Sequence, residues 1–229
     1  MIAPKAQMPL RLWLEDDAHL DNFYPGKGAN IELVNYLKAN QPDLLYLFGP
    51  ASCGVSHLLF ALCKRAEQQG RRVQYIPLQE LVAEPSEMLS YLGEVDFLCV
   101  DNIEAIKVSN DWQQALFNLY NQIRDQGGTV LFGAHIAPTE LSIDLADLRS
   151  RVLAGEVWSV QELSDEDKMI ALQKRAESRG FSLSDQVARY LINHKDRDMS
   201  SLMDLLSRLD RLSLEQKKLI TLPFVKNFL

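Results

Sequence analysis

The chain has 229 residues, of which 47% are hydrophobic and 24% charged, so it can form one domain with a substantial core and a smaller second domain. Its net charge of −7 is uneven: residues 1–160 hold 12 Lys and Arg against 20 Asp and Glu, whereas residues 161–229 hold 12 against 11. This acidic balance argues against a general DNA binder, whose affinity comes largely from neutralising phosphates.

Three features of the sequence predict a cytoplasmic protein that does not span a membrane. No apolar run approaches the length of a membrane span, and the N-terminus lacks the basic-then-apolar order of a signal peptide. The three cysteines show neither metal-ligand spacing nor an even count, as expected in a reducing compartment.

Residues 1–15 are expected to form an extended arm, because two prolines precede any strong helical pattern. Within the arm, Gln7, Leu10 and Leu12 are spaced so that they could anchor an extended peptide in an apolar groove of a partner. The alternative is an unattached tail.

The sequence FYPG at residues 23–26 predicts a turn before a helix at Ile31–Ala39. The aromatic ring of Tyr24, or that of Phe23, could stack on a nucleotide base beside Pro25. Both rings could equally pack on the core.

A strand, a glycine-bounded loop and a helix follow one another in residues 44–62. The apolar strand Leu44–Phe48 stops at Gly49, and Gly54 opens an apolar helical pattern five residues later. This is the layout of a phosphate-binding P-loop, in which backbone N–H groups and a helix N-terminus face an anion. The candidate nucleotide-binding residues here are Gly49, Ala51, Ser52, Cys53, Gly54, Val55, Ser56 and His57.

The loop departs from the usual motif at one position. Val55 stands where P-loops carry lysine, so no side-chain cation reaches the β- and γ-phosphates from there, while Ser56 stands where a hydroxyl reaches Mg²⁺. The loop therefore predicts either a site with a backbone cradle and no charge clamp, or a strand-to-helix turn without a ligand.

The rest of the first 160 residues alternates between strands and helices. Further strands are predicted at Val73–Pro77, Phe97–Asp101, Val130–Gly133 and Val157–Val160, and helices at Leu81–Leu92 and Trp112–Arg124. The strands and helices predict an α/β domain with a five-stranded parallel sheet at residues 16–160.

Asp101 ends the third of these strands, which is the layout of a Walker B motif. At that edge of the sheet its carboxylate and Ser56 could hold Mg²⁺ weakly. The next residue is Asn102, which cannot take a proton from water, and Glu104 is expected to point away. These residues predict a hydrolytically poor site.

From Gln161 onward the pattern is helical throughout, with Ser164 as a predicted N-cap and a last helix from Pro223. Residues 161–229 are therefore expected to form a small helical lid domain.

The order of these parts is that of an AAA+ module, and the chain resembles the DnaA-homologous regulatory inactivators of DnaA over essentially its whole length. The resemblance is carried by QMPLRL at residues 7–12, FYPG at 23–26, VDNIE at 100–104, LFNLYN at 116–121, LSDEDK at 163–168 and LPFVKNFL at 222–229.

The resemblance implies a negative regulator of bacterial replication initiation that binds ADP or another nucleoside diphosphate. It implies that Gln7, Leu10 and Leu12 bind the DNA polymerase III sliding clamp (its β subunit), and that DNA is reached only through the clamp, near the nucleoid. Arg151 matches an arginine finger, which would act in trans on ATP bound to DnaA.

The sequence leaves several points open. Phe117 and Asn121 are neighbours by helical spacing and could form a subunit face in a homo-oligomer or with a partner, although core packing also explains Phe117. His135 stands where related modules carry Asp or Asn. Ser200 falls near the position of the lid's sensor arginine, and Arg197 is three residues away.

Two other functions remain open. One is an autonomous AAA+ ATPase of the loader type, against which Val55 and Asn102 argue. The other is a nucleotide-free scaffold of DnaA type. In the favoured interpretation the protein is not an autonomous enzyme and stimulates the ATPase of its partner.

Overall fold

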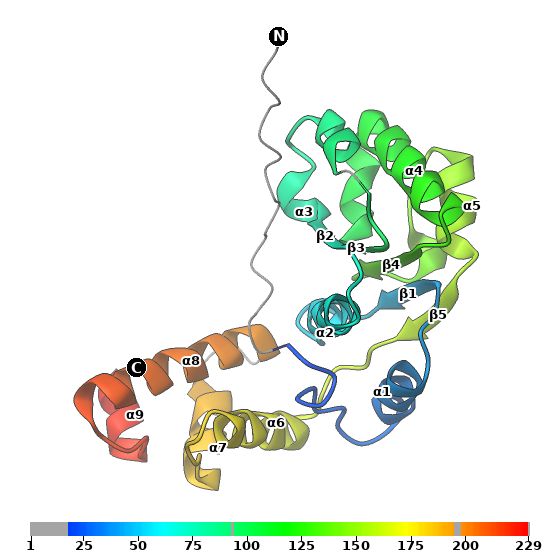
Figure 1. The fold of residues 1–229 in the computed structure, drawn as a ribbon. Coiled ribbons are helices and arrows are strands. Elements are labelled where there is room, and N and C mark those ends of the chain that lie inside the picture. The colour runs from blue at the N-terminus through cyan, green and yellow to red at the C-terminus, as the bar shows by residue number, and fades with distance from the viewer. Residues whose placement is uncertain (1–17, 93, 195–197, 229) are drawn as a thin grey trace.

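The computed structural model describes residues 18–92, 94–194 and 198–228, and shows a sheet domain followed by a helical lid (Figure 1). The sheet has five parallel strands in the order β2-β3-β4-β1-β5. The strands are β1 (Leu44–Phe48), β2 (Val73–Pro77), β3 (Phe97–Asp101), β4 (Thr129–Ala134) and β5 (Glu156–Ser159). The predicted α/β class is confirmed, and the predicted strands differ from these by at most one residue at each end.

The helices that cover the sheet include one correction to the sequence-based prediction. The structure has α1 (Ala29–Ala39), α2 (Val55–Gln68), α3 (Leu78–Leu81), α4 (Asn110–Asp125) and α5 (Ala146–Leu153), with 3₁₀ turns at Ser86–Tyr91, Ile103–Val108 and Pro138–Glu140. The predicted helix Leu81–Leu92 is wrong, because α3 ends at its first residue. Pro85 has no N–H and disfavours a helical conformation in the residue before it, so only a 3₁₀ turn follows.

Two apolar layers cover the two faces of the sheet, because side chains alternate along each strand. Tyr46, Val100 and Phe132 belong to the buried cluster that contains α4 residues, whereas Leu45 and Leu131 belong to the cluster formed with α1 and α2. Burial on both faces explains the near-continuous apolar runs of β1, β3 and β4. The carboxyl end of β1 leads directly into the loop before α2.

The lid consists of α6 (Asp165–Ser178), α7 (Asp185–His194), α8 (Met199–Gln216) and α9 (Leu222–Phe228), packed around their own apolar cluster. Ser164 caps α6 by accepting a hydrogen bond from the Asp167 N–H at 3.1 Å, which confirms the predicted N-cap. Asp198 caps α8 in the same way, through the Ser201 N–H at 2.9 Å.

Hydrogen bonds of Tyr24 and Asn30 join the start of the sheet domain to the lid and to the segment that leads into it. The Tyr24 hydroxyl donates to Asp167 Oδ1 of α6 at 3.2 Å. Asn30 at the start of α1 hydrogen-bonds the backbone of Gln161, where the chain enters the lid. In the part of the chain that the structure describes, no helix combines the length and the apolar character needed to cross a membrane.

Candidate nucleotide-binding site

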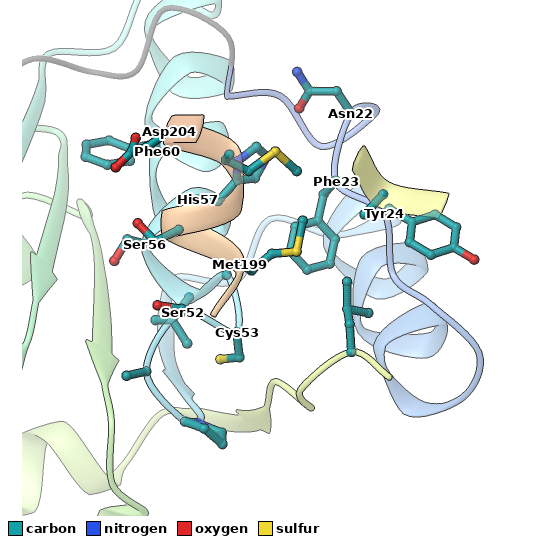
Figure 2. A pocket seen from close by; sticks show the side chains of 18 of the residues that line it. Asn22, Phe23, Tyr24, Ser52, Cys53, Ser56, His57, Phe60, Met199 and Asp204 are labelled. Carbon is teal, nitrogen blue, oxygen red and sulfur yellow. The ribbon is translucent and has the colours of Figure 1, made fainter. Parts of the chain in front are cut away.

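A cavity of about 360 Å³ lies between the sheet domain and the lid. Figure 2 shows the cavity, whose walls include residues 22–24, the loop and first turns of α2, and α8 of the lid. His135, Leu163 and Ala171 complete the lining. Of the predicted nucleotide-binding residues, those that line the cavity are Tyr24, Ala51, Ser52, Cys53, Gly54, Val55, Ser56 and His57. Pro25, Gly49 and Asp101 are not among the lining residues.

The loop before α2 has the backbone conformation of a curled cradle. Ser52 and Gly54 have φ values of 63° and 106°, in the left-handed region. The first hydrogen bond at the start of α2 runs from the Leu58 N–H to the Gly54 carbonyl at 3.0 Å, so the helix does not use the N–H groups before it. Those groups and the helix dipole favour an anion at this end of the cavity.

Two aromatic residues before the loop have different surroundings. A Cβ atom at Gly54 would lie 2.6 Å from the ring of Phe23, so this ring packs directly on the loop. Figure 2 shows that the side chain of Tyr24 points away from the loop, and its hydroxyl donates to Asp167. Lys174 Nζ lies 4.8 Å from the centroid of the Tyr24 ring. Phe23 is therefore the aromatic residue in contact with the cradle.

Gly49 supports the loop instead of lining the cavity. Its N–H donates to the Ala134 carbonyl at 3.2 Å, and a Cβ atom at this position would overlap the Val160 carbonyl oxygen and Cys53 Sγ. Only glycine fits where β1 leaves the sheet.

The cavity offers no lysine or arginine side chain among the described residues that line it. Val55 is 4% exposed and packs in the apolar core. His57 lines the cavity, where burial lowers its pKa to about 4, so the imidazole is neutral at pH 7. Its Nε2 lies 3.4 Å from the His19 carbonyl. No side-chain cation is therefore available to an anion from the described residues that line the cavity.

Asp101 is buried at the end of β3 with its carboxylate already hydrogen-bonded. Oδ2 accepts from the Ser56 hydroxyl at 2.6 Å and from the Tyr75 hydroxyl, and Oδ1 accepts from the Asn102 N–H at 2.9 Å. Among the described residues, no group of three or more His, Cys, Asp and Glu side chains could hold a metal ion. Mg²⁺ needs six ligands and keeps several waters, so this enclosed carboxylate does not fit as its direct ligand.

The polar residues that follow β3 and β4 meet at the carboxyl edge of the sheet. Asn102 Nδ2 lies 3.1 Å from His135 Nε2, and the His135 N–H donates to Glu104 Oε1 at 3.3 Å. Glu104 thus does not point away, contrary to the expectation from sequence. Its Oε2 atom is buried with no hydrogen-bond partner among the described residues. Asn102 and Glu104 are held by His135, which itself lines the cavity.

The lid contributes residues to the site, and apart from Ser200 those on α8 were not singled out from the sequence. Met199, Ser200, Met203 and Asp204 of α8 line the cavity, and the Ser52 hydroxyl donates to Asp198 Oδ1 at 3.1 Å. Ser200 thus lines the cavity, whereas Arg197 lies outside the described residues. These α8 residues reach the cavity because α8 docks on the loop. No local pattern in the sequence indicates this docking.

The residues predicted to bind partners lie away from the cavity or outside the described residues. Arg151 is exposed in the last turn of α5, and no ion pair of Arg151 occurs in the described ranges. Figure 1 shows α5 far from the lid. Phe117 packs against the core cluster that contains α4, and Asn121 is partly exposed. Gln7, Leu10 and Leu12 lie outside the described residues.

Comparisons with known proteins agree with this architecture. Residues 14–159 match the bacterial DnaA ATPase domain family, and residues 165–229 match the lid domain of Hda. Domain III of the replication initiation protein DnaA from Thermotoga maritima is similar in structure, with a TM-score of 0.75 and 22% identity over 93% of this chain and 97% of that chain.

Two further solved structures share the fold. AMPPCP-bound DnaA from Aquifex aeolicus has a TM-score of 0.69 and 20% identity, over 88% of this chain and 67% of that chain. A RuvB variant from Thermotoga maritima has a TM-score of 0.64 and 16% identity, over 92% and 70%. The chain therefore belongs to the bacterial DnaA ATPase domain family and, with its Hda-type lid, is an Hda/DnaA-like AAA+ protein.

Proposed function

We propose that the protein is a negative regulator of replication initiation in the bacterial cytoplasm, and that it acts by stimulating hydrolysis of ATP bound to DnaA. In this proposal the protein holds ADP or another nucleoside diphosphate in its own cavity. It binds the sliding clamp on DNA through Gln7, Leu10 and Leu12, and it supplies Arg151 in trans.

One observation carries the proposal. Arg151 is exposed on α5 and lies away from the chain's own cavity, whereas that cavity has neither the P-loop lysine nor an acid at position 102. An arginine that cannot serve its own site and has no ion pair among the described residues suits a finger for a neighbouring site. The same residues argue against an autonomous ATPase.

The cavity supports the nucleotide part of the proposal. Its backbone cradle suits phosphate groups, and its volume suits a small ligand. The Aquifex relative binds AMPPCP, an adenine nucleotide analogue, which favours an adenine nucleotide here. Among the described residues that line the cavity there is no side-chain cation for a third phosphate, which favours a diphosphate.

The test is a hydrolysis assay with ATP-bound DnaA, clamp loaded on DNA, and either the wild-type protein or a variant. We expect Arg151→Ala to reduce the stimulated rate by about 10³–10⁵-fold, the range for arginine fingers. Arg149→Ala is a matched control, because Arg149 is exposed on the same helix two residues earlier. Full stimulation by Arg151→Ala would refute the finger.

The remaining parts are tested separately. Purified protein should release a stoichiometric nucleoside diphosphate on denaturation; protein without nucleotide and without a thermal shift on adding ADP would favour the scaffold.

Gln7→Ala or Leu10→Ala should weaken clamp binding without changing the melting temperature. Turnover by the protein alone, lost in Asp101→Ala, would favour the autonomous ATPase.

A further inference from the structure

The carboxylate of Asp101 joins three parts of the sheet domain. Ser56 donates to it from the first turn of α2 at 2.6 Å, Tyr75 donates from β2, and the Asn102 backbone donates from the residue after β3. A carboxylate has about four lone-pair sites. Three of them are thus used by protein groups.

The space around this carboxylate is filled on the side of β4 as well. A Cβ atom at Gly133 would lie 2.6 Å from Asp101 Oδ1 and 3.0 Å from Val55 Cγ1. Asp101 is 3% exposed. The side chain that replaces the P-loop lysine therefore helps to close the region where a hydrated cation would lie.

Tyr75 is buried in a fixed position and keeps the proton that it donates to Asp101. It is 7% exposed, and its ring stacks on Phe60 with centroids 4.2 Å apart. Burial, and then the neighbouring Asp101 carboxylate, raise the pKa of Tyr75, so the phenol keeps its proton at physiological pH. β2 lies beside β3, with Tyr75 in register with Cys99, two residues before Asp101.

We propose that the hydrogen bond from Tyr75 makes the Asp101 carboxylate unavailable to a hydrated cation, and that the site therefore binds its nucleoside diphosphate without a divalent cation. The proposal rests on nucleotide binding in the proposed function. Mg²⁺ in nucleotide sites is held by carboxylates or by waters bound to them, together with phosphate oxygens. Here the Tyr75 hydroxyl donates to the acceptor atom that such a water would need. The phosphates would instead be bound by the N–H groups at the start of α2 that the helix does not use.

The experiment measures ADP affinity of the full chain by calorimetry, once with excess Mg²⁺ and once with EDTA. We compare wild type, Tyr75→Phe and Tyr120→Phe; the last removes a hydroxyl from α4, in the other core cluster. Wild type and Tyr120→Phe should bind ADP equally with and without Mg²⁺. Tyr75→Phe frees an acceptor on Asp101, so Mg²⁺ should tighten its ADP binding by about tenfold.

Two results of the calorimetry would overturn the proposal. One is tighter ADP binding by the wild type when Mg²⁺ is added. The other is binding that is independent of Mg²⁺ in Tyr75→Phe as well, because Tyr75 would then not be the reason.

A second measurement uses the ligand-free protein. Melting temperatures of Tyr75→Phe, Asp101→Asn and the double variant form a double-mutant cycle. The double variant should lose clearly less than the sum of the two single losses, and additive losses would overturn the assignment of Tyr75 to Asp101. If no variant binds ADP, the proposed nucleotide function fails, while the cycle still decides this assignment.

Discussion

The side chain of Asn30 holds the backbone of Gln161 by two hydrogen bonds: the Gln161 N–H donates to Asn30 Oδ1 at 2.8 Å, and Asn30 Nδ2 donates to the Gln161 carbonyl at 2.9 Å. Asn30 is 3% exposed and lies at the start of α1, while Gln161 is where the chain leaves the sheet domain. The pair therefore fixes the direction in which the chain enters the lid.

Asn30→Ala should lower the free energy of unfolding by about 2 kcal/mol, because two hydrogen bonds are lost and two backbone groups of Gln161 lose their partner. Urea denaturation measures the change. Asn40→Ala is the control, since the side chain of Asn40 is exposed and donates to the Tyr36 carbonyl within its own helix region; it should change the free energy by less than about 0.5 kcal/mol. Equal effects of the two substitutions would contradict the role of Asn30.

His57 should make the protein less stable as the pH falls below neutral. Burial lowers its pKa to about 4 in the folded protein, whereas the unfolded chain has a value near 6.5. Between these two values the unfolded state binds more protons, so stability rises with pH, by up to about 1.4 kcal/mol per pH unit from this group. His57→Gln should flatten this part of the stability profile, measured by urea denaturation from pH 4 to 7. An unchanged slope would show that His57 is not buried in its neutral form.

Gly49→Ala should destabilise the fold by about 3 kcal/mol, because the added methyl group would overlap the Val160 carbonyl and Cys53. Gly70→Ala separates this overlap from backbone strain: Gly70 has a φ of +77° and nothing within 4 Å of an added Cβ, so only strain of about 1–2 kcal/mol is expected. Thermal unfolding compares the two. A smaller loss for Gly49→Ala than for Gly70→Ala would argue against close packing at the start of the loop.

For the ADP-bound form of the proposed function, Ser52→Ala should speed the release of ADP, because it removes the hydrogen bond that joins the loop to Asp198 before α8. One such bond is worth about 1 kcal/mol, or about fivefold in rate. Stopped-flow release of a fluorescent ADP analogue measures the effect. Ser207→Ala is a control on α8, because it removes hydrogen bonds inside the lid: the Ser207 hydroxyl donates to the Met203 carbonyl and accepts from Arg179 Nη1. A matching acceleration by that variant would show that the Ser52 contact is not the cause.

The sequence predicted those parts of the fold that depend on local pattern. Buried strands such as Leu44–Phe48 are apolar runs between turn residues, and they occur where expected. The helix predicted at Leu81–Leu92 is wrong, because Pro85 interrupts the apolar spacing that indicated a helix. A single proline prevents a helix over a segment of this length, even where the apolar residues have helical spacing.

The parts of the site that could not be predicted depend on contacts between distant segments. Tyr75 reaches Asp101 only because β2 lies beside β3 in register, and Asp204 reaches the cavity only because α8 docks on the loop. Both residues look like ordinary core or surface positions in the sequence. The P-loop itself was found because its glycines and its helix lie within one short segment.

The absence of lysine and arginine from the described lining of the cavity has a consequence for the rate at which nucleotide enters. A protein of net charge −7 repels a nucleotide anion at a distance, and the field of peptide dipoles is felt only near the first turn of a helix. Capture should therefore be slow at low ionic strength and become faster as salt screens the repulsion.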